Sequence, residues 1–243
     1  MGNLKLPEDH STPEFWGDAK SALLKVWIQE GASFSKLIME SETAAWHPGG
    51  FMIFDVPAPL LRANIRLHVW PRGGRKGLYP PNDSTGELED GAIHNHVWRI
   101  SSFCLLGYRD VIVKLNSLAK RNSLIGGPYQ AYEVEYRSPT DQQFSPVGGT
   151  TEVEVEAYRE IASGTFHQIE AGVLHVPLVP IGSPAATLVL RSAPIVAGGP
   201  LVLFSDPPNS SVRRDEVTKQ DRAKACEVMS EALAALDEVE LDQ

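Results

Sequence analysis

Cysteine, surplus positive charge and long apolar runs are scarce in this chain of 243 residues, and each scarcity excludes a class of protein. The two cysteines, Cys104 and Cys226, fall in very different contexts, which predicts no disulfide framework and a reducing, cytoplasmic setting. A net charge of −9 argues against nucleic acid and against an anionic membrane as partners. No run approaches the roughly 20 apolar residues of a membrane-spanning helix. Met1–His10 lacks the pattern of a secretory signal.

Several catalytic motifs are also absent. The sequence has no glycine-rich phosphate loop with its lysine, no Ser-His-Asp pattern and no Cys-x-x-Cys. Its hydrophobic content of 42% is ordinary for a soluble globular protein, and its length suits one large domain. The function must therefore be sought in other residues.

The order of patterns along the chain predicts one domain with a β-rich middle. Helical spacing of apolar residues predicts helices at about 12–30, 33–42 and 212–239. We expect three segments: residues 1–50 as a helical segment packed on a barrel, residues 51–205 as the β-barrel, and residues 206–243 as a C-terminal helix.

Strand patterns follow one another through the middle segment, with glycine and proline between them. A loop at 71–90 is rich in Gly, Pro, Asn and Asp. Many short strands with this spacing predict a closed or double-sheet antiparallel architecture. The predicted strands after this loop are 93–106, 108–115, 130–137, 152–161, 165–170, 174–179, 186–192 and 200–204.

Three histidines form the most informative pattern. His94 and His96 are two residues apart, so on an extended chain both imidazoles project from the same face. If His175 joins them from a neighbouring strand, a metal gains three neutral nitrogen ligands and keeps open positions for substrate or oxygen. The alternative is a set of barrel histidines that pack with hydrogen-bond partners.

Other side chains are candidates for the same pocket. His167 precedes His175 by eight residues and could be a fourth ligand, a proton shuttle, a supporting partner or a partly exposed strand residue. Arg66 and His68 share a strand face, which either lines the pocket or covers the outside. Trp98 follows the face of His94 and His96, where it narrows the pocket or packs in the core. His10 and His47 are expected at the surface.

Arginines matter because the guanidinium group binds a carboxylate with two hydrogen bonds. The substrate-binding candidates are Arg62, Arg66, Arg99 and Arg191. For each of them the alternative is a solvated surface charge.

Both histidine segments resemble the two motifs of the cupin superfamily. The first motif is matched by Gly91, His94-x-His96 and Gly107, and the second by Gly164, Gly172 and His175. The glutamate ligand of most cupins is missing near residues 100–101. A three-histidine site without glutamate is similar to that of the thiol dioxygenase branch, which includes cysteine dioxygenase.

This resemblance implies a cupin barrel (a double-stranded β-helix, or jelly roll) that commonly dimerises, binds Fe(II) and reacts a metal-bound substrate with O₂. It also implies a carboxylate-binding role for Arg62 and an inward-facing Arg191. The Ser-x-His-x-Tyr relay of the branch is missing, because the matching strand reads Thr187-Leu188-Val189-Leu190-Arg191. The substrate is therefore expected to differ from cysteine.

The leading hypothesis is a non-haem Fe(II) oxygenase that acts on a small polar, acidic or amino-acid-like substrate. The resemblance also implies a homodimer. Ni, Zn, Mn and Cu remain open as the metal, since imidazole suits several of them. Two other functions remain open. One is a metal-dependent isomerase or lyase in which His167 moves a proton, and the other is a non-catalytic cupin that binds a small molecule.

Overall fold

A computed structural model describes residues 13–57, 65–72, 88–90, 93–116, 128–138, 141–180, 182–206 and 208–237. Arg62 and most of the predicted 71–90 loop lie outside these residues. No helix within the described ranges is long and apolar enough to cross a membrane.

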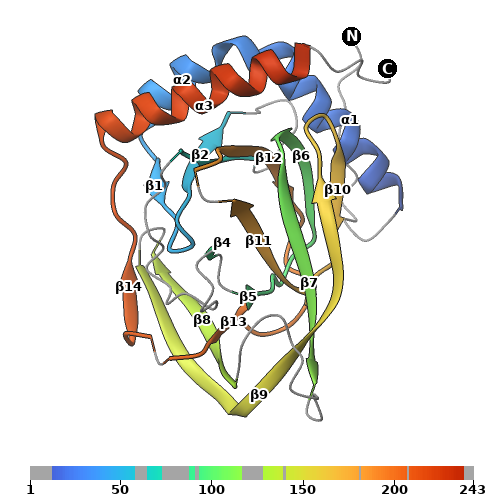
Figure 1. Cartoon of the computed structure of the whole chain (residues 1–243), viewed down its shortest axis with the longest axis vertical. Helices are drawn as coiled ribbons and strands as arrows, with labels where there is room; N and C mark the ends of the chain where they lie inside the picture. The colour runs from blue at the N-terminus through green and yellow to red at the C-terminus, as the bar shows by residue number, and fades with distance from the viewer. Residues whose placement is uncertain are drawn as a thin grey trace.

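Two antiparallel sheets make up most of the described chain (Figure 1). The first has the order β1 (Ala45–Trp46), β2 (Met52–Val56), β3 (Ile65–Trp70), β12 (Ala185–Arg191), β6 (Ile100–Leu106) and β10 (Phe166–Ile169). The second has the order β14 (Ser211–Arg213), β9 (Asp141–Ile161), β7 (Tyr108–Asn116), β11 (Leu174–Pro180), β5 (Ile93–His94), β13 (Leu201–Phe204) and β8 (Tyr129–Ser138). A short strand, β4 (Leu88–Asp90), also pairs with β11.

The strand order identifies the fold. Within the first sheet, β3, β12, β6 and β10 are neighbours, and within the second, β5, β11, β7 and β9 are neighbours. Along the chain these eight strands alternate between the sheets, apart from β7 and β9, which follow each other in the second sheet. This is the winding of a double-stranded β-helix, or jelly roll. The predicted mainly β fold, with a double-stranded β-helix barrel and helices near both ends, is confirmed.

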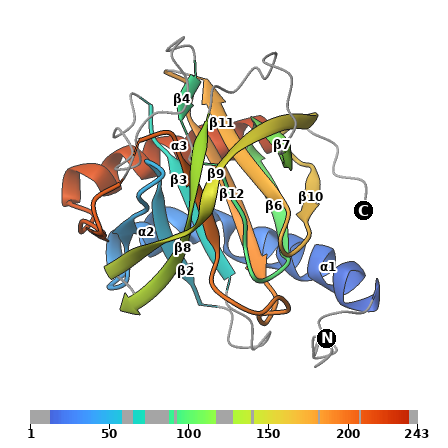
Figure 2. The same ribbon diagram turned by 90° about the horizontal axis from the view of Figure 1, so that it is seen from below.

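Three α-helices cover the outer face of the first sheet. They are α1 (Pro13–Glu30), α2 (Phe34–Glu40), which follows the short 3₁₀ turn η1 (Gly31–Ser33), and α3 (Lys219–Asp237). Leu23, Phe34 and Met229 are fully buried in one cluster with strand residues such as Phe54 and Leu188. β8 and the bend of β9 lie on the opposite side of the molecule (Figure 1), and they are in front when the molecule is seen from below (Figure 2). The inner face of the first sheet is thus left to face the second sheet.

Some predicted boundaries were wrong. The sheets begin at β1, inside the segment expected to be helical, and continue to β14, beyond residue 205. The strand predicted at 93–106 is split into β5 and β6, because the chain crosses from one sheet to the other between them. Asn95 holds the start of this crossing: its side-chain oxygen accepts a hydrogen bond from the backbone N–H of Leu201 at 2.7 Å. His96 therefore lies after a strand and not on one.

Gly107 joins β6 to β7 at a point where the backbone of Ile161 passes close by, so a larger residue should not fit there. A Cβ atom at this position would lie 2.9 Å from the carbonyl oxygen of Ile161. Gly107→Ala is expected to lower the free energy of unfolding by about 1–3 kcal/mol, because backbone must shift to relieve the contact. Thermal and urea unfolding measure the loss.

Gly149→Ala is the matched control, because a Cβ atom there meets nothing within 4 Å. Equal effects of the two substitutions would show that the close approach at Gly107 is not the cause.

Candidate metal centre and cavity

The structure brings His94, His96 and His175 together. One donor nitrogen from each of the three side chains lies within 4.8 Å of the other two. His94 and His175 are directly opposite each other on β5 and β11, and their ring centroids are 4.6 Å apart. Nε2 of His96 lies 3.2 Å from Nε2 of His175. Two nitrogens bound at about 2.0–2.1 Å to one tetrahedral ion are separated by about 3.4 Å, so this spacing fits a metal.

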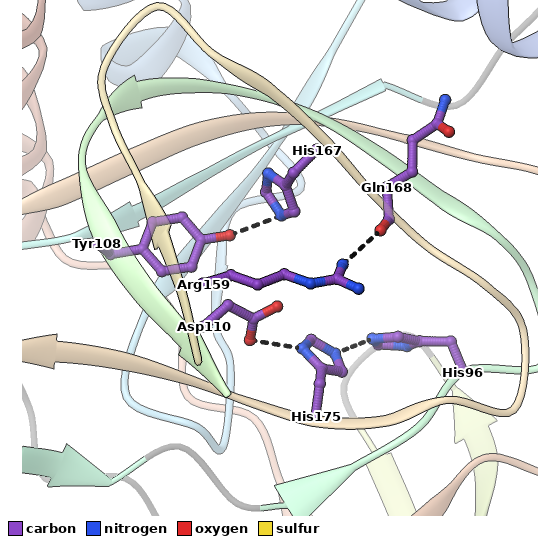
Figure 3. A network of polar contacts seen from close by, with 7 residues as sticks. All are labelled: His96, Tyr108, Asp110, Arg159, His167, Gln168 and His175. Carbon is purple, nitrogen blue, oxygen red and sulfur yellow. Dashed lines mark hydrogen bonds and ion pairs between the residues drawn. The ribbon is translucent and has the colours of Figure 1, made fainter. Parts of the chain in front are cut away.

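A carboxylate orients one of these imidazoles from behind. Asp110 Oδ1 lies 3.0 Å from Nδ1 of His175, on the side of the ring away from His96 (Figure 3). This contact places a proton on Nδ1 and directs the lone pair of Nε2 toward the other histidines. The side chain of Asp110 is only 1% exposed, and its Oδ2 has no partner among the described residues. A buried carboxylate is costly, so a cation held by His175 would offset its charge.

Burial keeps His96 in the form that a metal needs. Loss of hydration lowers the pKa of His96 well below its usual value, and the nearby His94 and His175 lower it further. A neutral imidazole is the ligating form, so His96 does not have to lose a proton before it binds a metal. The donor set is therefore suited to a divalent metal in charge and in spacing.

These histidines line a cavity between the two sheets. The space that the centres of water molecules can reach is about 90 Å³. One bound water needs roughly 10–15 Å³ of such space, so the cavity can hold a small organic molecule. Six histidines and three arginines line it, and none of its described lining residues is a carboxylate.

A tyrosine and a histidine form a second polar pair in the cavity. The hydroxyl of Tyr108 lies 3.0 Å from Nε2 of His167 (Figure 3). Burial raises the pKa of Tyr108 well above its usual value and lowers the pKa of His167 to about 4, so both groups are neutral near pH 7. Nδ1 of His167 is buried and has no partner among the described residues. This pair can hold a shared proton beside a bound molecule.

Arginines bring positive charge to the same cavity. Arg191 lies over the ring of Trp98, with its guanidinium carbon 4.7 Å from the ring centroid, and burial lowers its pKa to about 10. Nε of Arg66 lies 3.1 Å from Oδ1 of Asp55 on the neighbouring strand. Arg214 lies over Tyr136 at 5.7 Å. All three arginines line the cavity, which makes it a place for an anion.

Eight of the candidates predicted from the sequence line one cavity. They are His94, His96, His175, His167, Arg66, His68, Trp98 and Arg191. Arg62 lies outside the described residues, so its predicted role stays untested. Arg99 is not among the lining residues and pairs with Glu170 instead. The roles assigned to all of these residues remain predictions.

Several residues at the site were not predicted from the sequence. His47, expected at the surface, lines the cavity, and burial lowers its pKa well below the usual value. Tyr108, Asp110 and Arg214 were not candidates at all. Asp110 was the most detectable of these, because it shares a strand face with Tyr108 and Ile112, where a carboxylate needs a partner. Nothing local marks His47 or Arg214.

Comparisons with known proteins find only distant similarity. No family model and no curated protein matches the chain. A structure of the DMSP lyases RdDddP and RnDddQII is 14% identical over 62% of this chain and 51% of that chain, with a TM-score of 0.31. Oxalate decarboxylase from Bacillus subtilis is 11% identical over 71% of this chain and 30% of that one, with a TM-score of 0.28. A cupin-2 domain of Rhodospirillum rubrum is 12% identical over 77% of this chain and 80% of that chain, with a TM-score of 0.24.

The chain thus spans about half of the matched lyase chain and under a third of the decarboxylase chain. The fold follows from the strand order and not from these similarities.

Asp110 offers a test of the centre that does not depend on activity. Asp110→Asn is expected to weaken metal binding by about 10–100-fold, because the amide supports His175 less well and carries no charge. Competition with a chromogenic chelator measures the affinity. Glu160→Gln is the control, since this exposed carboxylate on β9 pairs with Arg109. Unchanged affinity in Asp110→Asn would show that Asp110 does not support a bound metal.

His167 should make the stability of the metal-free protein depend on pH. Its pKa is about 4 when folded and about 6.5 when unfolded, so the unfolded chain takes up the proton first. The contribution of neutral His167 to the free energy of unfolding is complete well above pH 6.5, and it is lost as the pH falls from there toward 4. In His167→Gln this fall should be shallower by up to about 1.4 kcal/mol per pH unit. Urea unfolding between pH 7 and 4.5 provides the comparison, and identical slopes would contradict it.

Proposed function

We propose that this chain is a metal-dependent enzyme, a non-haem Fe(II) oxygenase that acts on a small organic anion. The observation that carries the proposal is the convergence of three imidazole donors on a cavity that also contains arginines. Three protein ligands leave coordination positions for other molecules. Iron rests on the resemblance to three-histidine thiol dioxygenases, and Ni, Zn, Mn and Cu are the alternatives.

Five of the surrounding residues have a role in this proposal. Bound Fe(II) supplies positions at which substrate and O₂ can react with each other. Asp110 keeps Nε2 of His175 in its ligating form. Arg191 and Arg66 orient the anionic group of the substrate, and the neutral Tyr108–His167 pair gives or takes a proton at Nε2 or the hydroxyl.

The substrate is expected to differ from cysteine. Strand β12 lacks the histidine and tyrosine of the thiol dioxygenase relay and has Thr187, Val189 and Arg191 facing the cavity. The Tyr108–His167 pair comes instead from β7 and β10. We infer that the anion-binding and proton-transferring groups are arranged for a different molecule.

A second candidate function is a metal-dependent lyase or isomerase. The specific support for it is the Tyr108–His167 pair, because proton abstraction next to a metal-polarised group needs such a neutral base. Dioxygen consumption separates the two candidates, since the lyase or isomerase turns over without it.

The metal content of the purified protein tests the shared part of both candidates. The expected result is about one metal ion per chain by elemental analysis, with a loss of at least tenfold in His96→Ala, because two remaining imidazoles hold a metal weakly. Lys114→Ala is the control, as an exposed substitution on β7. O₂ uptake is then measured with amino acids, keto acids, cysteine and 3-mercaptopropionate.

O₂ uptake with a carboxylate that contains no thiol supports the oxygenase, and anaerobic turnover supports the lyase or isomerase. Rapid sulfinate formation from cysteine would contradict the expected substrate. A chain without bound metal, unchanged by His96→Ala, would overturn both candidates.

A further inference from the structure

The cavity has an aromatic wall that a small aliphatic substrate would not use. Phe51, Trp70 and Tyr108 form this aromatic wall. The ring centroids of Phe51 and Trp70 are 4.5 Å apart, and those of Trp70 and Tyr108 are 5.7 Å apart in a stacked arrangement. All three side chains line the cavity beside the metal ligands. Large aromatic rings at a cavity surface bind flat ligands, because ring pairs gain more than area burial alone.

Trp98 presents a second flat surface. Its ring is stacked on His96, at 5.7 Å and 27°, and it also packs against the guanidinium of Arg191 at 4.7 Å. One indole ring thus separates a candidate metal ligand from a cation. A ligand that touches both of them lies along Trp98.

Two buried donors at this surface lack acceptors within the described part of the chain. Nε1 of Trp98 and Nε of Arg191 are buried without a hydrogen-bond partner among the described residues. Both residues line the cavity, and the described lining contains no carboxylate that could accept from them. Because buried donors are almost always paired in native proteins, these two point to an acceptor on the bound molecule. A carboxylate supplies several acceptor sites.

We propose that the substrate is a planar organic anion, namely an aromatic or conjugated carboxylate, with its flat part against the aromatic wall and its carboxylate at Arg191. The guanidinium group donates in its own plane, and a conjugated carboxylate is coplanar with its ring. One flat molecule that reaches from Arg191 to the aromatic wall would therefore pair with the arginine and pack against the rings at the same time. This proposal rests on the proposed function for the metal end of the cavity and names the substrate class.

Three probes separate charge from flatness. Benzoate is flat and anionic, cyclohexanecarboxylate is anionic but not flat, and benzyl alcohol has the ring without the charge. Calorimetry with the metal-loaded and the metal-stripped protein is expected to show benzoate binding about threefold to tenfold tighter than cyclohexanecarboxylate. It should also bind at least tenfold tighter than benzyl alcohol. Equal affinity for either pair, or no binding of any probe, overturns the proposal.

Variants assign the two preferences to their residues. Trp70→Leu should remove the preference for benzoate over cyclohexanecarboxylate and keep the requirement for charge. Arg191→Gln should remove the preference for benzoate over benzyl alcohol and keep the preference for benzoate over cyclohexanecarboxylate. Tyr158→Leu is the control, because this half-exposed aromatic residue on β9 is not among the lining residues. Circular dichroism checks folding, and Trp98→Leu replaces Trp70→Leu if that variant does not fold. Retained ring selectivity in the tryptophan variant that folds overturns the proposal.

The same measurements separate this inference from the proposed function. Selective benzoate binding by a chain that binds no metal ion at all, even when metal is added, would support the flat anionic site and overturn the metal-dependent enzyme. A chain that holds a metal but does not distinguish the probes would overturn the flat anionic site and leave the metal-dependent enzyme supported.

Discussion

The register of β11 is the constraint on which the candidate centre depends. β11 lies between β5 and β7 in the second sheet, with His175 opposite His94 on one side and Ile112 on the other. Asp110, two residues before Ile112, then reaches Nδ1 of the same histidine. Because side chains alternate along a strand, a slip of one residue would turn His175 to the other face and separate it from both partners.

The double-stranded β-helix explains why this sheet can hold such polar groups. The helices bury the outer face of the first sheet with apolar side chains, so stability does not depend on filling the interior between the sheets with aliphatic residues. That interior receives histidines, arginines and aromatic rings beside a few aliphatic side chains such as Ile100 and Val189. Arg191 and Asp110 keep buried polar atoms there that have no partner within the described part of the chain, which is costly unless a bound group completes them. The arrangement is typical of a site in which ligands are part of the energetic balance.

Charge is distributed unevenly between the cavity and the outside of the protein. The chain has a net charge of −9, yet the cavity contains Arg66, Arg191 and Arg214, and no carboxylate is found among its described lining residues. The acidic side chains on the long strand β9, such as Glu154 and Glu160, are exposed. An acidic exterior with a basic interior favours a small anion over a large polyanion, because only the small one reaches the arginines.

The sequence by itself determined the β-rich fold class, the helices near both ends and the three histidines, because these depend on local periodicity and short spacings. It also placed Arg66 and His68 on one strand face, since alternation is a local property. Only the tertiary structure decided which faces turn inward and which distant residues meet. Asp110 reaches His175 across 65 positions, and His47 reaches the cavity from the start of the chain. Such contacts follow from strand order and register, which are set by packing of the whole barrel and leave no local pattern.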